Sequence, residues 1–267
     1  MAINVHQFRD TVLTYYRKHK RDLPWRETTD PYRIVVSEVM LQQTQVPRVL
    51  SKYPEFLEKF PNFSTLASAS LSEVLLVWQG MGYNRRGKYL KQLAEVIVQK
   101  YNGELPHNPI LVDELPGIGP ATAASICAFA FNLPTVFIET NIRRVFIHHL
   151  FQDQIDIPDT AIYPLVQQTL DTENPRDWYY ALMDYGTYLG KTLENPNKRS
   201  RHYTIQSKFE GSDRQIRGAI LRLLLKKSQS REEIIEALQK DQERVITILK
   251  QMKKEAIIQQ EQNLFFI

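Results

Sequence analysis

Apolar residues recur at helical spacing along most of this 267-residue chain. Up to residue 193, apolar positions three and four residues apart are separated by polar ones, which is the pattern of amphipathic helices. Helices are predicted over residues 6–18, 32–44, 46–60, 64–66, 71–78, 85–101, 108–114, 120–131, 141–151, 161–170 and 175–189. Alternation of period two is not convincing before residue 255, so we predict that residues 1–193 form an all-α main domain.

The pattern changes after the main domain. Residues 194–211 are polar and basic and contain proline and asparagine, which predicts a linker. Three short helices are predicted after it, over residues 212–226, 230–239 and 242–254. Ser230 stands three residues before Glu233, as in a capping box, and residues 256–267 have the pattern of a β-hairpin. Residues 212–267 are therefore predicted to form a small α+β, winged-helix-like domain, with a helical cap on the main domain as the alternative.

Composition narrows the class of protein. Hydrophobic residues make up 43% and charged residues 24% of the chain, as in ordinary globular proteins, and the early charges of the N-terminus are unlike a secretory signal. The single cysteine, Cys127, excludes an internal disulfide and any all-cysteine metal site. The net charge is +4, and residues 212–267 hold 11 basic against 8 acidic residues. We expect a cytoplasmic protein without a membrane span whose partner is acidic.

A glycine-rich turn at residues 115–119, Leu-Pro-Gly-Ile-Gly, precedes a helix of small apolar residues. Backbone N–H groups at such a turn and helix start face outward together and favour a phosphate. Glu139 follows as the one acid in an otherwise apolar run, with Asn141 two residues later. A phosphate-binding turn near a lone carboxylate suggests chemistry on nucleic acid.

Five short motifs resemble those of the helix-hairpin-helix DNA glycosylases, and among them the MutY-type adenine glycosylases. They are Leu23-Pro24-Trp25-Arg26, Ser37-Glu38-Val39-Met40-Leu41-Gln42-Gln43-Thr44-Gln45-Val46, Gly80-Met81-Gly82-Tyr83, Leu115-Pro116-Gly117-Ile118-Gly119 and Met183-Asp184-Tyr185-Gly186. The resemblance covers about residues 5–190, with the motifs in order. It implies two helical lobes with a cleft between them, and an enzyme that flips a base out of DNA and cuts its N-glycosidic bond.

The resemblance also implies roles for two carboxylates. Glu38 matches the family's glutamate that protonates the departing adenine, and its apolar helix should raise its pKa by desolvation. Glu139 falls where the family has an essential aspartate, and a carboxylate there would stabilise the positive charge that develops on the sugar. The alternative for Glu38 is a buried structural acid. Because Glu139 is one methylene longer than aspartate, its alternative is an altered centre that still binds DNA.

Contacts with double-stranded DNA are implied in the same way. Amide and aromatic side chains would enter the duplex, and the hairpin would hold a phosphate. The expected DNA-binding residues are Gln42, Gln43, Tyr83, Arg85, Arg86, Gly117, Gly119, Thr122, Asn141, Lys198, Arg199 and Arg201. Two basic clusters lie among or beside these residues: Arg85, Arg86, Lys88 and Lys91 form the first, and Lys198, Arg199 and Arg201 form the second. For each cluster the alternative is a surface that only faces solvent.

Three departures from the family change the expectation. Ala121 replaces the lysine that serves as nucleophile in bifunctional relatives, so we predict no lysine-dependent lyase step. The four iron–sulfur cysteines would fall near Gly190, Asn197, Ser200 and Gln206, so we expect no such cluster, although the hairpin carbonyls could hold a monovalent cation. The full-length MutY-type enzymes that these motifs resemble also carry a large C-terminal domain that reads 8-oxoguanine, and we expect residues 212–267 to stand in its place.

The sequence therefore predicts a monofunctional DNA glycosylase of base excision repair, with adenine as the first candidate base. A uracil or thymine mismatch glycosylase on the same scaffold is one alternative, because Glu139 and Ala121 reshape the pocket. A non-catalytic DNA-binding protein is another. We expect a monomer that acts on double-stranded DNA.

Overall fold

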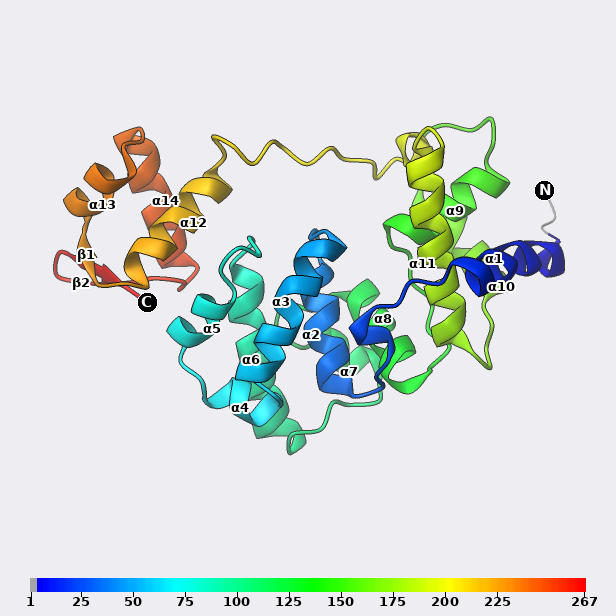
Figure 1. Ribbon diagram of the computed structural model, residues 1–267, viewed down its shortest axis with the longest axis horizontal. Helices are drawn as coiled ribbons and strands as arrows, with labels where there is room; N and C mark the ends of the chain where they lie inside the picture. Colours follow the sequence, from blue (N-terminus) through cyan, green and yellow to red (C-terminus); the bar gives the residue numbers. More distant parts are fainter. Residues whose placement is uncertain (1–3) are drawn as a thin grey trace. The chain divides into compact units, whose positions relative to one another are not determined.

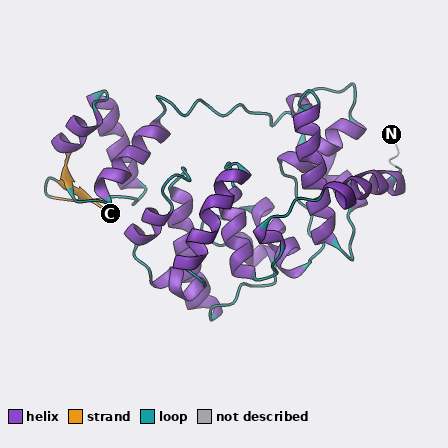
Figure 2. Cartoon of the chain, viewed as in Figure 1, coloured by secondary structure: helices purple, strands orange, loops and turns teal. Residues whose placement is uncertain are grey.

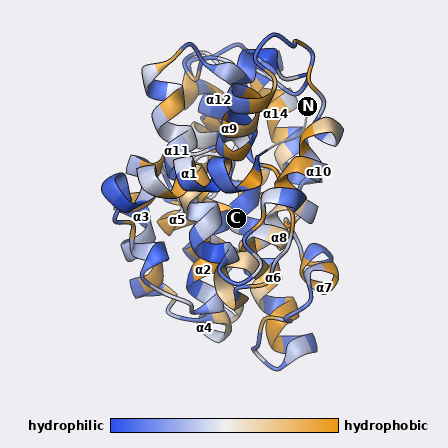
Figure 3. Ribbon diagram, turned by 90° about the vertical axis from the view of Figure 1, so that its right-hand side faces the viewer, coloured by the Kyte–Doolittle hydropathy of each residue, from blue (hydrophilic) through white to orange (hydrophobic). Residues whose placement is uncertain are grey.

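The computed structural model describes residues 4–267, which are mostly helical with a small sheet near the C-terminus (Figure 1 and Figure 2). This confirms the predicted all-α main domain followed by a small α+β region. The chain divides into two compact units. Unit 1 comprises Met1–Glu38, Pro106–Glu114 and Ile118–Ile205, and unit 2 comprises Val39–Leu105, Leu115–Gly117 and Gln206–Ile267. Hydrophobic and hydrophilic residues alternate along most helices, as the amphipathic pattern predicts (Figure 3).

Unit 1 is built around α11, which packs against α9 and α1. Its helices are α1 (Val5–His19), η1 (Pro24–Arg26), α7 (Pro109–Asp113), α8 (Pro120–Phe131), α9 (Thr140–Leu150), α10 (Asp159–Thr169), α11 (Pro175–Thr192) and η2 (Pro196–Arg199). Phe8, Phe146 and Trp178 pack with ring centroids 5.1 to 6.2 Å apart in the centre of this core. Large aromatic side chains of this kind contribute much of the buried apolar area that stabilises a domain.

Unit 2 contains the middle helices and the C-terminal region. Its elements are α3 (Val46–Lys59), α4 (Phe63–Ser68), α5 (Leu71–Val77), α6 (Arg85–Tyr101), α12 (Asp213–Leu224), β1 (Gln229–Ser230), α13 (Arg231–Leu238), α14 (Gln242–Lys254), β2 (Gln259–Glu261) and β3 (Leu264–Phe266). The helix α6 packs against α4 and α5. The helix α2 (Pro31–Leu41) begins in unit 1 and ends in unit 2, and the division between the units falls directly after Glu38.

The C-terminal region has a core of its own. Ile220, Ile234, Leu249 and Phe265 are buried in it, and Leu75 of α5 belongs to the same cluster. The strands form an antiparallel sheet in the order β1-β3-β2, and the capping box at Ser230 forms as predicted. The predicted hairpin corresponds to β2 and β3, whereas β1 was not predicted because two residues are too short to show a period.

The segment predicted as a linker is packed in its first half. Ile157 donates a backbone hydrogen bond to Arg199 and accepts one from Arg201, and Asn197 is buried with its side-chain amide on the Thr140 carbonyl at 2.9 Å. The first residues of the segment predicted as a linker, up to Arg201, are therefore paired with other parts of the chain. The Asn197 amide ties this segment to the start of α9, and the backbone bonds of Arg199 and Arg201 tie it to Ile157; a polar composition does not reveal such local pairing.

Candidate active site

Glu38 lies near the C-terminal end of α2. Its carboxylate accepts a hydrogen bond of 2.5 Å from the Ser125 hydroxyl on α8. The side chain keeps some solvent exposure, yet the surrounding protein desolvates it. Burial raises the pKa of Glu38 to about 7, the nearby charge of Glu139 adds to the rise, and Ser125 and Arg26 oppose it. A carboxyl group with a pKa of about 7 is partly protonated at neutral pH and can donate that proton.

Glu139 forms the N-cap of α9. One carboxylate oxygen accepts the backbone N–H groups of Asn141 at 2.7 Å and Ile142 at 2.9 Å, and the other accepts the Asn141 side-chain amide at 3.2 Å. Burial raises the pKa of Glu139, while the two backbone donors and the charges of Arg144 and Arg143 oppose that rise. Burial is the largest of these effects, so the pKa of Glu139 is raised overall, and the helix start and these donors limit the rise by stabilising the charged form.

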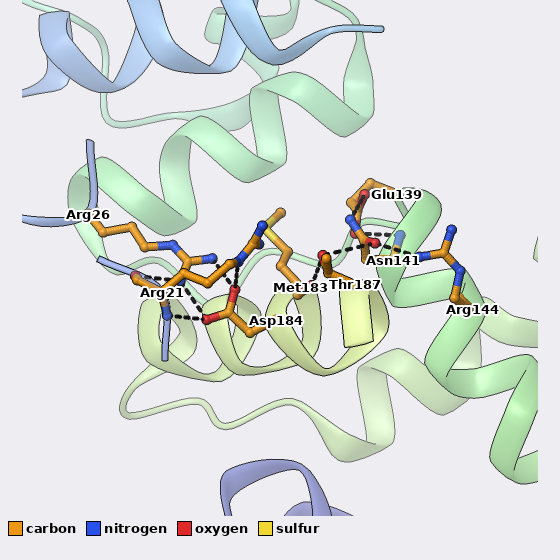
Figure 4. Close-up of polar contacts among 8 residues, drawn as sticks. All are labelled: Arg21, Arg26, Glu139, Asn141, Arg144, Met183, Asp184 and Thr187. Atoms are coloured by element: carbon orange, nitrogen blue, oxygen red, sulfur yellow. Dashed lines mark hydrogen bonds and ion pairs between the residues drawn. The ribbon is translucent and has the colours of Figure 1, made fainter. Parts of the chain in front are cut away.

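A close contact between α9 and α11 fixes this carboxylate. Arg144 donates to the Asn141 side-chain oxygen at 2.8 Å and to the Gly186 carbonyl at 2.7 Å, and Asn141 in turn donates to Glu139 (Figure 4). A Cβ on Gly186 would lie 2.4 Å from the backbone oxygen of Asn141, so only glycine allows the helices to approach this closely. Asn141 was expected to bind DNA; its amide group is used within the protein, where it orients Glu139.

Asp184, in the same stretch of α11, holds two arginines (Figure 4). Its side chain is 1% exposed, and its carboxylate lies 2.5 Å from Arg21 and 2.8 Å from Arg26. Burial alone would raise the pKa of Asp184, but hydrogen bonds and charges from Arg26 and Arg21 hold it below the usual value. The Arg26 guanidinium also lies 4.5 Å from the ring centre of Tyr180, and its charge lowers the pKa of Glu38. Asp184 therefore holds Arg26, and the positive charge of Arg26 acts on the Glu38 carboxyl group.

The expected base-contacting residues lie on two turns. Gln43 is exposed and has a φ of 53°, a left-handed conformation that ends α2 and turns the chain toward α3. Tyr83 has a φ of 46° and follows Gly80 and Gly82, whose φ values are 87° and 68°. Both turns present side chains from backbone conformations that few residues adopt readily, which is frequent at binding sites. Gln42 precedes Gln43 and is partly exposed.

Arg86 corrects the expectation of a direct DNA contact. It is 9% exposed, and its guanidinium donates to the carbonyls of Val39 at 2.8 Å and Met40 at 2.9 Å, to Thr44 Oγ1 at 2.9 Å and to the Met81 carbonyl at 3.2 Å. Burial lowers the pKa of Arg86 to about 10. The charge caps the C-terminal end of α2 and joins it to the turn before α6, so it is not available to a phosphate. Its neighbour Arg85 is exposed.

Of the two glycines in the hairpin, Gly117 has a backbone conformation and surroundings that require glycine, whereas Gly119 has an extended backbone. Gly117 has a φ of 77°, and a Cβ there would lie 2.6 Å from Tyr89 Cβ, so both backbone and space demand glycine. Gly119 is extended, at φ −126° and ψ 172°, and is followed by Pro120 at the start of α8. Thr122, in the first turn of α8, is partly exposed. The turn and the helix start thus have the backbone form that the phosphate-binding hypothesis needs.

Comparison with known proteins places this geometry in a family. Residues 36–165 match the family described as "HhH-GPD superfamily base excision DNA repair protein". An adenine DNA glycosylase of Mycobacterium tuberculosis is 31% identical over 247 residues, which cover 80% of this chain and 77% of that protein. The chain belongs to this family. The suspected membership among the helix-hairpin-helix glycosylases, close to the adenine glycosylases, is thereby confirmed.

Other proteins similar to this chain include longer adenine DNA glycosylases and a thymine-DNA glycosylase. An adenine DNA glycosylase of Buchnera aphidicola subsp. Baizongia pistaciae is 35% identical over 187 residues, or 68% of this chain and 52% of that protein. The chain spans about half the length, or less, of the first curated relatives that it matches. A solved structure of a thermostable thymine-DNA glycosylase aligns with a TM-score of 0.64 and 27% identity, over 73% of this chain and 91% of that one.

The positions at which the family resemblance would put iron–sulfur cysteines do not fit a cluster. Asn197 is buried with its amide on a backbone carbonyl, and a Cβ on Gly190 would lie 2.6 Å from the Arg144 guanidinium. The one cysteine, Cys127, is buried in α8, where burial raises its pKa to about 11. Within residues 4–267 no group of three or more His, Cys, Asp or Glu is placed to hold a metal ion.

None of the helices among residues 4–267 is long and apolar enough to cross a membrane.

The basic residues near these positions have partners in the protein. The Arg199 guanidinium donates to the carbonyls of Phe151, Gln152 and Ile147 at the C-terminal end of α9, so it caps that helix and is not free for a phosphate, contrary to expectation. Lys198 pairs with Glu194 at 3.1 Å and Arg201 with Asp156 at 2.7 Å, and all four side chains are more than half exposed. Such surface pairs are weak, so the cationic ends of Lys198 and Arg201 remain accessible to solvent.

Several residues important to the site were not singled out from the sequence. Arg26 and Asp184 lie inside matching motifs, so their place in the family pattern was the available signal, but their mutual contact was not visible. Ser125 and Arg144 lie in ordinary helical stretches and gave no signal. Their roles follow only from packing between helices far apart in the sequence.

Proposed function

We propose that this chain is a monofunctional DNA glycosylase of base excision repair that hydrolyses the N-glycosidic bond of a mismatched adenine. The observation that carries the proposal is the pairing of Glu38, whose pKa is raised to about 7, with Glu139, whose charge is stabilised by a helix start. Two carboxylates in unlike environments can divide acid catalysis and charge stabilisation. The names of the similar adenine glycosylases support adenine as the base.

In the proposed reaction the nucleotide is first extruded from the duplex, because its glycosidic bond cannot be reached within the stack. Protonated Glu38 gives its proton to the departing base, which leaves as a neutral molecule. The positive charge that develops on the sugar is stabilised by ionised Glu139, and water then adds to the anomeric carbon and releases a proton that restores the protonated form of Glu38. Since Ala121 has no amine, the reaction would end at an abasic site without a covalent lysine intermediate.

A second candidate is a thymine or uracil mismatch glycosylase. The alignment with a thymine-DNA glycosylase over 91% of that chain favours it, as does Glu139 in place of the shorter family acid. Both candidates share the two carboxylates and differ in the shape of the base pocket.

Incubation with duplexes carrying A·8-oxoguanine, A·G, T·G, U·G and hypoxanthine pairs, followed by hot alkali, separates these candidates. Strand breaks at adenine support the first proposal, and breaks at pyrimidine mismatches alone favour the second. If no duplex is cut but abasic-site duplexes are bound, the chain is a non-catalytic DNA-binding protein. A break that appears without alkali would contradict the proposed absence of a lyase step.

We also propose that the C-terminal region, residues 212–267, is a winged-helix-like DNA-binding domain. The order of three helices and an antiparallel sheet with a β2–β3 hairpin supports this, as does a groove of about 290 Å³ between α13, α14 and the hairpin. The groove is lined by Arg231, Glu232, Ile246, Leu249, Lys250, Lys253, Gln260, Asn263 and Phe265. Three cations against one acid make it suitable for a phosphate backbone.

The remaining parts of the proposal concern partners. We propose that the protein acts as a monomer on double-stranded DNA in the cytoplasm, and that the hairpin carbonyls hold a monovalent cation when DNA is bound. Light scattering gives the mass of the free protein and of its DNA complex, and so tests whether the protein is a monomer. Replacing potassium by tetramethylammonium at constant ionic strength tests the second, because the larger ion cannot be ligated by carbonyls.

A further inference from the structure

The turn that carries Tyr83 is held firmly from its inner side. Trp78 donates from its indole N–H to the Gly82 carbonyl at 3.1 Å, and Arg86 donates to the Met81 carbonyl at 3.2 Å. The Arg86 guanidinium also lies 5.5 Å from the centre of the Tyr83 ring. These contacts fix the left-handed backbone at Tyr83, but they leave the far end of its side chain unrestrained.

The far end of the ring is held by residues more than a hundred positions later. The Tyr83 hydroxyl accepts a hydrogen bond from Arg214 Nη1 at 3.1 Å and another from the Gln206 side-chain amide. The Arg214 guanidinium carbon lies 5.4 Å from the ring centre, a cation–π distance. Its second terminal nitrogen donates to the Ser207 carbonyl at 2.5 Å. Arg214 thus clamps both the ring and the segment that leads into α12.

Arg214 is itself placed by a packed domain. It lies in the first turn of α12, whose residues Ile216 and Ile220 are buried in the C-terminal core together with Leu75 of α5. Lys88 on α6 donates to the Glu255 carbonyl at 2.5 Å, and the Glu255 carboxylate pairs with Arg217 on α12. The guanidinium therefore meets Tyr83 from a fixed support and not from a mobile tail.

We infer that Arg214 is a positioning residue for recognition of the flipped nucleotide, and that through it the C-terminal domain orients the Tyr83 ring. This inference rests on the proposed function, in which an aromatic side chain wedges into the duplex. A wedge has to enter at a defined angle between bases. A ring that is ordered before DNA arrives loses less conformational freedom on binding, so the clamp tightens binding without taking part in bond cleavage.

The test is a double-mutant cycle between Arg214→Ala and Tyr83→Phe in the full-length protein. Tyr83→Phe keeps the ring but removes the hydroxyl that Arg214 and Gln206 hold. Dissociation constants are measured for a duplex with a stable abasic-site analogue, and single-turnover rates for the cleaved mismatch. Each single variant should bind roughly three- to tenfold more weakly, as for loss of one or two hydrogen bonds. The double variant should bind no more weakly than the weaker single variant, and its single-turnover rate should fall no further than that of the slower single variant.

Arg222→Ala is the matched control, because Arg222 is an exposed arginine on the same helix. Arg214→Lys, which keeps the charge and one donor to the hydroxyl, should recover part of the affinity. Equal weakening by Arg222→Ala and Arg214→Ala, or additive effects of Arg214→Ala and Tyr83→Phe, would overturn the inference. If the wild-type protein cuts no substrate, the proposed function is contradicted but this inference is not. The dissociation constants of the double-mutant cycle would still decide whether Arg214 positions Tyr83.

Discussion

At the scale of single residues, two carboxylates carry the proposed chemistry, and their surroundings differ. Glu38 is desolvated and has one hydroxyl donor, whereas Glu139 has two backbone donors, an amide and the N-terminal end of α9. The sequence allowed both to be predicted as site residues, because each is an acid in an apolar stretch at a position where the family resemblance implies a carboxylate. The sequence could not show that Arg86 is buried. A charged residue at the start of a helix gives the same sequence pattern whether its side chain faces water or caps another helix.

Replacing Glu139 by glutamine should nearly abolish base release. The amide oxygen of glutamine can still accept from Asn141 and Ile142, so the cap of α9 is largely kept, but the negative charge opposite the sugar is lost. Loss of such electrostatic stabilisation lowers rates by roughly a hundred- to thousandfold. Single-turnover cleavage measures the rate, and a gel-shift assay with intact substrate should show binding within a few-fold of wild type. Unchanged turnover would show that Glu139 is not the charge-stabilising group.

The activity should fall as the pH rises through about 7, because Glu38 acts in its protonated form and its pKa is raised to about 7. Above that value the rate should drop by about tenfold per pH unit. A pH profile of the single-turnover rate at saturating DNA checks this. In Glu38→Gln the remaining activity should lose that basic limb, so a limb that persists in the variant would belong to another group.

The raised pKa of Glu38 also predicts that the stability of the folded protein depends on pH. The folded-state pKa of Glu38 lies above its unfolded value, so folding is favoured at low pH and becomes less favourable as pH rises through about 7, where ionised Glu38 stays desolvated. Glu38→Gln removes this penalty, and the variant should be more stable than wild type at pH 8 by on the order of 1 kcal/mol, with discounting for partial exposure. The gain should shrink at pH 5, and thermal melting at both pH values measures it.

At the scale of elements, the contact between α9 and α11 connects the fold to the site. Helical periodicity predicted both helices to within a few residues, because each has one apolar face. Their mutual distance was not predictable, since it depends on Gly186 fitting against the backbone of Asn141 and on Arg144 bridging the two helices. The packing of η2 against α9 was missed for the same reason, because hydrogen bonds between distant polar groups have no period.

Gly186→Ala should weaken both stability and activity. Alanine normally suits a helix better than glycine by about 1 kcal/mol, but here its Cβ would lie 2.4 Å from a backbone oxygen that cannot rotate away. The helices must separate, which should destabilise the protein by roughly 1–3 kcal/mol and lower the melting temperature by several degrees. Because Asn141 orients Glu139, cleavage at saturating DNA should also slow at least tenfold.

Gly218→Ala is the matched control for that substitution. Gly218 also lies within a helix, α12, and a Cβ there meets nothing within 4 Å. The alanine should therefore leave cleavage unchanged and raise the free energy of unfolding by about 0.5–1 kcal/mol. Equal melting temperatures for the Gly186→Ala and Gly218→Ala variants would contradict the steric account of the α9–α11 contact.

At the scale of the whole molecule, the order of the chain does not match the order of the units. The sequence suggested a main domain, a linker and a C-terminal domain, yet the C-terminal elements group with α3 to α6 in unit 2. The contacts responsible, such as Lys88 with Glu255 and Arg214 with Tyr83, join residues more than a hundred positions apart. Local patterns predict elements well, but one sequence contains little information on which distant surfaces meet.

The groove on the C-terminal domain gives the prediction that belongs to this scale. If it holds a phosphate backbone, the double variant Lys250→Ala, Lys253→Ala should bind DNA more weakly at low salt and with a shallower salt dependence. Each lost phosphate contact lowers the slope of log affinity against log salt concentration by about 0.9, so a change of between one and two is expected. Cleavage at saturating DNA should stay unchanged, because neither lysine contacts the site formed by Glu38 and Glu139.

A second double variant, Lys226→Ala with Lys240→Ala, separates the groove from net charge. Both lysines are exposed on the same domain and neither lines the groove, so the loss of charge is identical. The salt slope of this control should remain close to that of wild type, as measured by fluorescence anisotropy between 50 and 200 mM salt, a range over which phosphate contacts change affinity by orders of magnitude. Equal slopes for the two double variants would assign the effect to overall charge. A steeper slope for the control than for the groove variant points instead to a defined path of DNA along α13, α14 and the hairpin, which extends the contact beyond the glycosylase fold.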